Sequence, residues 1–195
     1  MPTMYTHGTA LQVEDPGQLI RFGKLGWGAE AEFLPPQPDP RFPDTFDKFG
    51  PGSWFHLPLT SEPVADGIGR TVLTSILLMF ETSSCQITAL HIYDGPTRIE
   101  VADYPTDEQH FPGGLRSDNL FQPFTYELRQ PHTMLSAAGV SFYACSTTLP
   151  SRFETVPPRV LTVAAVGGVY RQDSIFTIFF TNVAQLFTGG PRLGG

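Results

Sequence analysis

The sequence predicts an all-β protein, an antiparallel β-sandwich of jelly-roll type with eight or nine strands. Three observations support this prediction. Short apolar runs recur at roughly the 8-to-15-residue spacing of such sandwiches. Nineteen Gly and nineteen Pro stand between these runs and mark turns. No stretch combines a sustained helical apolar period with capping residues, so long helices are not expected.

Length and charge restrict the organisation and the partners. The 195 residues suit one domain over residues 1–187, followed by a Gly-rich tail at 188–195. A net charge of −7 with scattered Lys and Arg argues against nucleic acid as a partner. No apolar window is long enough for a membrane span. No signal peptide is visible, which predicts a cytoplasmic protein or export by a signal-independent route.

The first third of the chain contains three expected strands. Residues 6–14 alternate apolar and polar side chains, which predicts a half-buried strand. Residues 21–33 predict an irregular strand or bulge around Trp27, because glycines beside a large ring often let another backbone pass close. Residues 53–59 predict a strand that Pro58 marks as an edge or an end.

Residues 34–52 differ from the rest of the chain. Six prolines exclude a helix or a central strand. Three phenylalanines, Phe42, Phe46 and Phe49, argue against a free linker. We therefore expect a long extended loop that its aromatic side chains hold against a surface, and a loop of this length is usually functional or interfacial.

The strongest strand patterns lie in the middle of the chain. Residues 70–81 and 85–94 are apolar on both faces, so these strands should be central or covered by a partner. A turn at Asp94-Gly95 leads into residues 97–103, which predicts a hairpin. In that second strand Ile99 and Val101 should point inward, and Arg98 and Glu100 outward.

The last strand is the sharpest feature of the sequence. Residues 120–129, 134–147, 159–170 and 174–187 predict the remaining strands. The last of them is apolar on both faces at Ile175, Phe176, Ile178, Phe179 and Phe180. Exposed, such a strand would aggregate. It is therefore either a central strand of a monomer or a strand that pairs with a neighbouring subunit.

Four blocks carry a resemblance to a known family. The blocks THGTALQVE, GWGAEAEF, SWFHLPL and ALHIYDG are similar to those of a family of small microbial proteins known only as a domain of unknown function. The similarity covers roughly residues 5–170. It implies a compact β-domain and carries no activity, cofactor or site residues. The Pro/Phe-rich insert and the residues after about 171 depart from the family.

The polar side chains do not predict a catalytic or metal site. A cupin-type metal site needs a His-x-His pair, which the chain lacks, so His56 and His91 are expected to be hydrogen-bonded structural residues. The group Asp103, Asp107, Glu108 and His110 favours a solvated loop over calcium binding or paired-carboxylate catalysis. No cofactor is expected.

Serine and cysteine chemistry is also not expected. Ser136, Ser141 and Ser146 lie in an alternating strand without the GxSxG pattern of a nucleophile elbow. Cys85 and Cys145 lie in strand-like runs and should be buried free thiols, with one disulfide between neighbouring strands as the alternative.

Together these features predict a non-enzymatic structural protein that assembles with itself into a homo-oligomer or filament. The expected contacts are Phe42, Phe46, Phe49, Ile175, Phe176, Ile178, Phe179 and Phe180. The alternative is a lectin-like module that binds a glycan or another small ligand. Its contacts would be Trp27, Trp54, Tyr93 and Tyr104 on one sheet face.

Overall fold

The computed structural model describes residues 3–36, 49–60, 69–104, 106, 114–147 and 158–174. The predicted contact residues Phe42 and Phe46 lie outside this part, as do the run from Ile175 to Phe180 and the predicted tail. Phe49 begins a strand, but its side chain also lies outside the described part.

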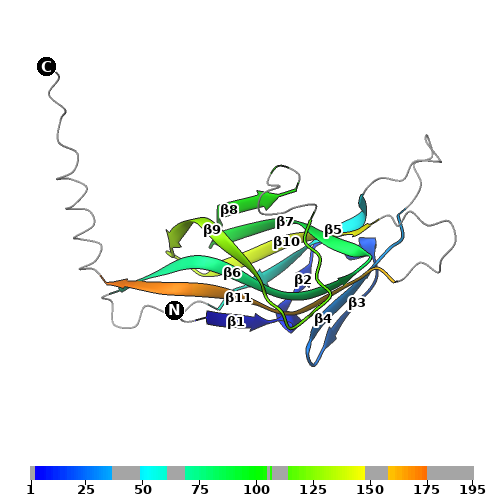
Figure 1. Cartoon of the computed structure of the whole chain (residues 1–195), viewed down its shortest axis with the longest axis horizontal. Helices are drawn as coiled ribbons and strands as arrows, with labels where there is room; N and C mark the ends of the chain where they lie inside the picture. The colour runs from blue at the N-terminus through cyan, green and yellow to red at the C-terminus, as the bar shows by residue number, and fades with distance from the viewer. Residues whose placement is uncertain are drawn as a thin grey trace, which may run out of the picture.

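The described residues form two antiparallel sheets that pack face to face, which confirms the predicted all-β sandwich (Figure 1). Sheet A has six strands in the order β3-β4-β11-β6-β9, with β1 also paired to β11, and sheet B has five in the order β2-β5-β10-β7-β8. No helix in the described part could cross a membrane. The strands are β1 (Thr3–His7), β2 (Gln12–Val13), β3 (Leu19–Leu25), β4 (Gly28–Phe33), β5 (Phe49–Pro58), β6 (Gly69–Ser83), β7 (Cys85–Asp94), β8 (Thr97–Asp103), β9 (Phe124–Thr133), β10 (Ala138–Thr147) and β11 (Val160–Ser174).

The described part holds eleven strands rather than eight or nine, partly because residues 6–14 are not one strand. β1 ends at His7, and a 3-10 turn over Gly8–Ala10 leads to β2. The His7 side chain accepts a hydrogen bond from the N–H of Thr9, and the N–H of Leu11 donates to the carbonyl of Gly8. This turn carries the chain from sheet A to sheet B and places Leu11 in the core between them.

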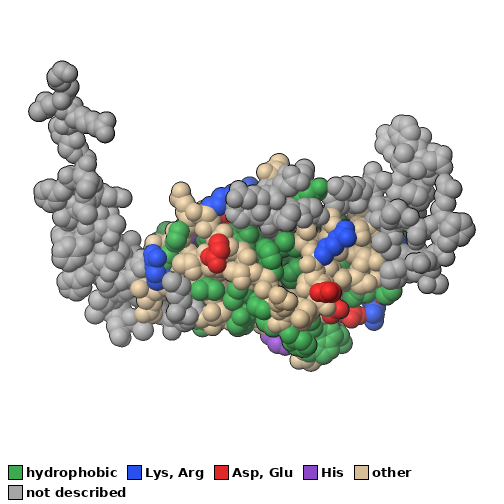
Figure 2. Space-filling view, in the orientation of Figure 1, with side chains coloured by type: hydrophobic (Ala, Val, Ile, Leu, Met, Phe, Trp, Pro, Cys, Tyr) green, Lys and Arg blue, Asp and Glu red, His purple; other side chains and the backbone are tan. Residues whose placement is uncertain are grey.

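The segment around Trp27 is a hairpin, not one irregular strand. β3 and β4 pair along their length and turn at Gly26 and Trp27, with a register shift only near Leu19. The expected close backbone approach occurs on one side of Trp27: a Cβ at Gly28 would lie 2.2 Å from the carbonyl oxygen of Val163. Trp27 is 45% exposed at the tip, where Figure 2 shows hydrophobic side chains gathered at the lower end of the molecule.

The Pro/Phe-rich insert is shorter than predicted, because its last four residues belong to β5. Gly52 pairs with Cys145 and Phe49 with Thr147, with a register shift between these pairs. Pro51 lies at this irregularity, where a missing backbone N–H is tolerated. β5 ends at Pro58, as predicted.

Phenylalanine rings fill the space between the sheets. Phe55 of β5 stacks on Phe142 of β10, with ring centroids 5.5 Å apart, and meets the edge of Phe33 from β4 in the other sheet. All three are fully buried. β6 lies between β11 and β9, and β7 lies between β10 and β8, which confirms that the two-faced apolar strands are central.

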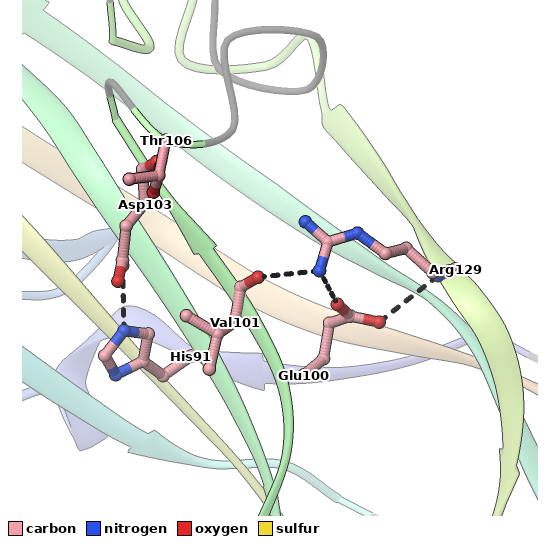
Figure 3. A network of polar contacts seen from close by, with 6 residues as sticks. All are labelled: His91, Glu100, Val101, Asp103, Thr106 and Arg129. Atoms are coloured by element: carbon pink, nitrogen blue, oxygen red, sulfur yellow. Dashed lines mark hydrogen bonds and ion pairs between the residues drawn. The ribbon is translucent and has the colours of Figure 1, made fainter.

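The β7–β8 hairpin was predicted correctly, with a turn at Gly95 (φ 56°), and Ile99 packs against the core and Arg98 is exposed as predicted, but the outward position of Glu100 was wrong. Glu100 is buried, and its carboxylate accepts a 2.9 Å hydrogen bond from Nη1 of Arg129 and a 3.2 Å bond from the N–H of Arg129. Figure 3 shows Arg129 reaching from β9 to Glu100 and to the carbonyl of Val101. β8 and β9 are edge strands of different sheets, so this ion pair joins the sheets.

Asp94 forms a second polar link at the end of β7. Its carboxylate accepts hydrogen bonds from the N–H groups of Leu135 (2.8 Å) and Ser136 (2.6 Å) and lies 3.1 Å from Nε2 of His132. Burial alone would raise the pKa of this carboxyl. The hydrogen bonds from Leu135, His132 and Ser136 outweigh burial and lower the pKa below its usual range.

We expect Asp94→Asn to lower the free energy of unfolding by about 2 kcal/mol at neutral pH, because three partners lose a charged acceptor. A carboxyl whose pKa is depressed by folding stabilises the protein above its unfolded pKa of about 4. That contribution disappears as the pH falls through the lower, folded pKa. Denaturant unfolding at pH 7 and pH 2.5 should therefore show the difference shrinking in acid. Exposed Asp118→Asn is the control, and a difference that does not change with pH would contradict this account.

The two cysteines are free and buried, which confirms the expected thiols. Cys85 pairs in register with Ser146, and Cys145 pairs with Gln86. Neighbouring residues of a strand point to opposite faces, so the two sulfurs lie on opposite sides of sheet B. Burial raises the pKa of Cys85 to about 12 and that of Cys145 to about 11.

We expect neither thiol to react with Ellman's reagent at pH 8 until the protein unfolds, because the reactive species is the thiolate. Both should react in denaturant. Groups whose pKa is raised by folding stabilise the protein below their unfolded pKa and lose this contribution as the pH rises. The free energy of unfolding should therefore fall between about pH 9 and pH 12. Rapid modification of the folded protein would show that one sulfur is accessible.

Candidate functional site

The side of sheet B that faces away from sheet A carries the candidate site, which we call the outer face. Alternation along β5, β10 and β7 places the core residues on one side. The other side gathers aromatic and polar side chains. They are Trp54, His56, Ser141, Tyr143, His91 and Tyr93.

A row of polar side chains crosses the middle of the outer face. Ser141 of β10 is in register with His56 on one side and with His91 on the other. Gln12 of β2 pairs with His56 and extends the row. The three strands therefore place one imidazole on each side of the Ser141 hydroxyl. We call these four residues the polar row.

His56 connects the row to a carboxylate. Its Nδ1 lies 2.7 Å from Oγ of Ser141, and its Nε2 lies 3.3 Å from Oε2 of Glu14. When Nε2 carries the proton it donates to Glu14, and Nδ1 then accepts from the Ser141 hydroxyl. Glu14 directly follows β2. Its backbone N–H donates a hydrogen bond to the carbonyl of Trp54, which fixes its position beside β5.

His91 is held in the same way from the other side. Its Nε2 lies 2.8 Å from Oδ1 of Asp103 on β8, as Figure 3 shows. The Trp54 ring covers it, with centroids 4.5 Å apart. The prediction that His56 and His91 are hydrogen-bonded residues is confirmed, and both lie on the one open face that also carries Trp54.

Trp54 and Tyr143 form an aromatic pair beside the polar row. Their ring centroids lie 5.5 Å apart in an edge-to-face arrangement. Burial raises the pKa of Tyr143, and the nearby Cys145 and Asp15 add to the shift. The phenol therefore stays protonated and can donate a hydrogen bond at neutral pH.

The polar row lines one open hollow on this face, and a second open hollow lies beside the Trp54–Tyr143 pair. One, of about 550 Å³, lies beside Tyr93, Pro58, Gly139 and the polar residues Gln12 and His56; we call it the Tyr93 hollow. The other, of about 400 Å³, we call the Trp54 hollow. Its lining includes Glu14, Asp15, Gln18, Trp54 and Tyr143.

The structure brings together only part of the predicted ligand-binding set. Trp54 and Tyr93 share the outer face. Trp27 does not, because it lies at the β3–β4 turn of sheet A. Tyr104 follows β8 and packs against the core. The prediction that all four lie on one sheet face is therefore wrong.

Sequence reasoning missed the contact between His56, Ser141 and Glu14. A signal was present: the triplets Trp54-Phe55-His56 and Ser141-Phe142-Tyr143 both place a core phenylalanine between two residues of aromatic or hydrogen-bonding type. Phe55 and Phe142 are register partners, so the flanking residues also meet across the strands. The pairing of Phe55 with Phe142 can be known only once the fold is known.

The described residues contain no group of three or more His, Cys, Asp or Glu side chains that could hold a metal ion. Comparison of the chain with protein-family models, with curated proteins and with solved structures finds no match.

The Glu14–His56–Ser141 contacts have the composition of a nucleophilic triad but not its surroundings. Acyl transfer needs preorganised hydrogen-bond donors directed at a developing oxyanion, most often backbone N–H groups. Ser141 lies in the middle of β10, whose backbone pairs with β5 on one side and β7 on the other. These N–H groups are therefore used within the sheet. Ser141 and His91 are themselves buried, so the groups of this face that a ligand can reach are the exposed side chains of Gln12, His56 and Glu14.

Proposed function

We propose that the protein is a non-enzymatic carbohydrate-binding domain and that the outer face of sheet B holds the sugar. The observation that carries the proposal is the polar row beside the Trp54–Tyr143 pair on one open face. Aromatic rings offer a flat apolar surface to the C–H face of a sugar. The exposed amide of Gln12, imidazole of His56 and carboxylate of Glu14 beside them offer hydrogen bonds to its hydroxyls.

We also infer that the sandwich is a jelly roll. The eight strands β4 to β11 lie in the orders β4-β11-β6-β9 and β5-β10-β7-β8. This order supports two interleaved Greek keys, the arrangement of jelly rolls. Jelly rolls occur in lectins and in capsid proteins, so the fold agrees with binding and with assembly. The site, not the fold, favours binding.

A glycan array with matched tryptophan variants tests the binding proposal. The two tryptophans are Trp27 and Trp54. Trp54→Ala should lower affinity about tenfold or more, because stacking contributes about 1 kcal/mol and Trp54 also covers His91. Trp27→Ala should bind as the parent does, since it lies on the other sheet. An array on which the parent protein binds no sugar would refute the proposal.

Self-assembly is the second candidate, and the end of β11 favours it. β11 pairs with β6 up to the pair of Ser174 with Gly69, directly before the apolar run that begins at Ile175. The proposal is that this run continues the pairing onto a neighbouring subunit and that Phe42, Phe46 and Phe49 add contacts.

Light scattering on the whole chain and on a variant lacking residues 175–195 tests the assembly proposal. The whole chain should be oligomeric and the shortened chain monomeric, with unchanged far-UV circular dichroism. A whole chain that is monomeric at high concentration would rule assembly out. Because the outer face lies on sheet B, glycan binding should survive the truncation.

A further inference from the structure

The two hollows on the outer face lie along one line. Tyr93 is in register with Gly139 of β10, and Trp54 is in register with Tyr143 of the same strand. Gly139 and Tyr143 are four residues apart, which corresponds to roughly 13 Å along a strand. That distance is longer than a single sugar ring. Ser141, at the centre of the polar row, lies halfway between them.

Each hollow combines an apolar wall with hydrogen-bonding groups. In the Tyr93 hollow, Tyr93 and Pro58 face the polar side chains of Gln12 and His56. In the Trp54 hollow, the aromatic pair faces Asp15 and Gln18. Glu14 and His56 stand between the hollows and line one each, so a ligand could reach both without a break.

The floor of the Tyr93 hollow is open because Gly139 has no side chain. A Cβ at this position would meet only the carbonyl oxygen of Leu57 and the Cβ of Tyr93, both at 3.9 Å. The backbone at Gly139 therefore needs no glycine for packing. Because Gly139 has no side chain, it leaves space on the outer face that a bound group can occupy.

The charge of the Trp54 hollow limits which ligands can bind in it. Glu14 and Asp15 line the Trp54 hollow, and the whole chain has a net charge of −7. An anionic ligand would be repelled at this end of the outer face. The carboxylates are instead suited to accept hydrogen bonds from neutral hydroxyl or amide groups.

We propose that the ligand is an uncharged, extended, β-linked oligosaccharide that lies along β5 and β10, with one ring in the Tyr93 hollow against the polar row and another in the Trp54 hollow. This inference rests on the proposed carbohydrate-binding function and specifies its ligand. The offset of the two hollows along β10 suits an extended chain whose successive rings follow the strand direction. Single rings fill one hollow and leave the other empty.

Calorimetric titration with cello- and chito-oligosaccharides of one to six rings tests the proposal. Affinity should rise at least tenfold from one ring to the length that reaches both hollows, and then level off. Gly139→Val should remove this gain for long chains, because the valine occupies the floor of the Tyr93 hollow on which the ring would lie. Binding of a single ring in the Trp54 hollow should be unchanged.

Two further variants make the result unambiguous. Gly23→Val on β3 is the matched control, since a Cβ there meets nothing within 4 Å and lies on the other sheet. Tyr93→Ala removes the aromatic wall of the same hollow and should also abolish the gain, so it serves as the test should Gly139→Val fold poorly. Equal affinity for one ring and for long chains, unaffected by either variant, would overturn the extended ligand and leave carbohydrate binding intact. No binding to any sugar would overturn both.

Discussion

Gly28→Ala should lower the free energy of unfolding by about 3 kcal/mol or more, at the upper end of what overpacking costs. A Cβ at Gly28 would lie 2.2 Å from the carbonyl oxygen of Val163 and 3.0 Å from the Cα of Ala164. Both are backbone atoms of β11, the strand that also pairs with β6 and β1. They cannot move aside without disturbing the centre of sheet A.

The neighbouring glycine provides the control. A Cβ at Gly26 meets no atom within 4 Å, so Gly26→Ala should change stability by less than about 1 kcal/mol. Denaturant unfolding followed by tryptophan fluorescence measures both variants. If Gly28→Ala proves insoluble while Gly26→Ala folds, the result also supports a large loss of stability at Gly28 alone. Equal stability of the two variants would show that β11 does not pass Gly28 as closely as described.

Arg129→Met should destabilise the protein by about 2–3 kcal/mol, because it leaves the Glu100 carboxylate buried with one backbone hydrogen bond. The side chain of Glu100 is 7% exposed and that of Arg129 is 48% exposed. The solvent around Arg129 weakens the pair, so we expect less than the full cost of a buried ion pair. The methionine retains the apolar stem that packs over β8.

A variant of an exposed arginine and a double variant show whether the loss of stability comes from the unpaired, buried Glu100 carboxylate. Arg21 is 63% exposed and contacts both Glu30 and Glu32, yet Arg21→Met should cost less than about 1 kcal/mol because water screens these contacts. Glu100→Leu combined with Arg129→Met should recover part of the stability, since no charge then remains buried. Equal losses for Arg21→Met and Arg129→Met would mean that the link between the sheets contributes little.

Strand positions could be predicted from the sequence wherever one strand carries its own pattern. The β7–β8 hairpin follows from the Asp94-Gly95 turn and the runs on either side. The burial of Glu100 on β8 could not be predicted, because alternation alone cannot show that Glu100 has a partner. Arg129 is distant in sequence and reaches Glu100 only because β9 is the edge strand of the opposite sheet. A charged residue was therefore assigned to solvent although it lies at a buried junction.

The candidate site was predictable only in part, for a related reason. Trp54 and Tyr93 were chosen as aromatic residues, and the structure places both on the outer face. Glu14 and Ser141 could not be chosen, because their meeting at His56 requires the pairing of β5 with β10 and the passage of the chain from β2 beside β5. Register between distant strands is a property of the whole sheet, and no local pattern specifies it.

The position of β11 has a consequence for the order in which the molecule can form. β1, β4 and β6 all pair with β11, although it is the last strand of the described part to leave the ribosome. Until it emerges, three earlier strands have unsatisfied edges, and the β3–β4 and β6–β9 parts of sheet A are not joined. Such non-local pairing slows folding and exposes aggregation-prone edges. We therefore expect sheet A to assemble only once β11 is available, which makes the pairing of β11 the late step in folding of the described part.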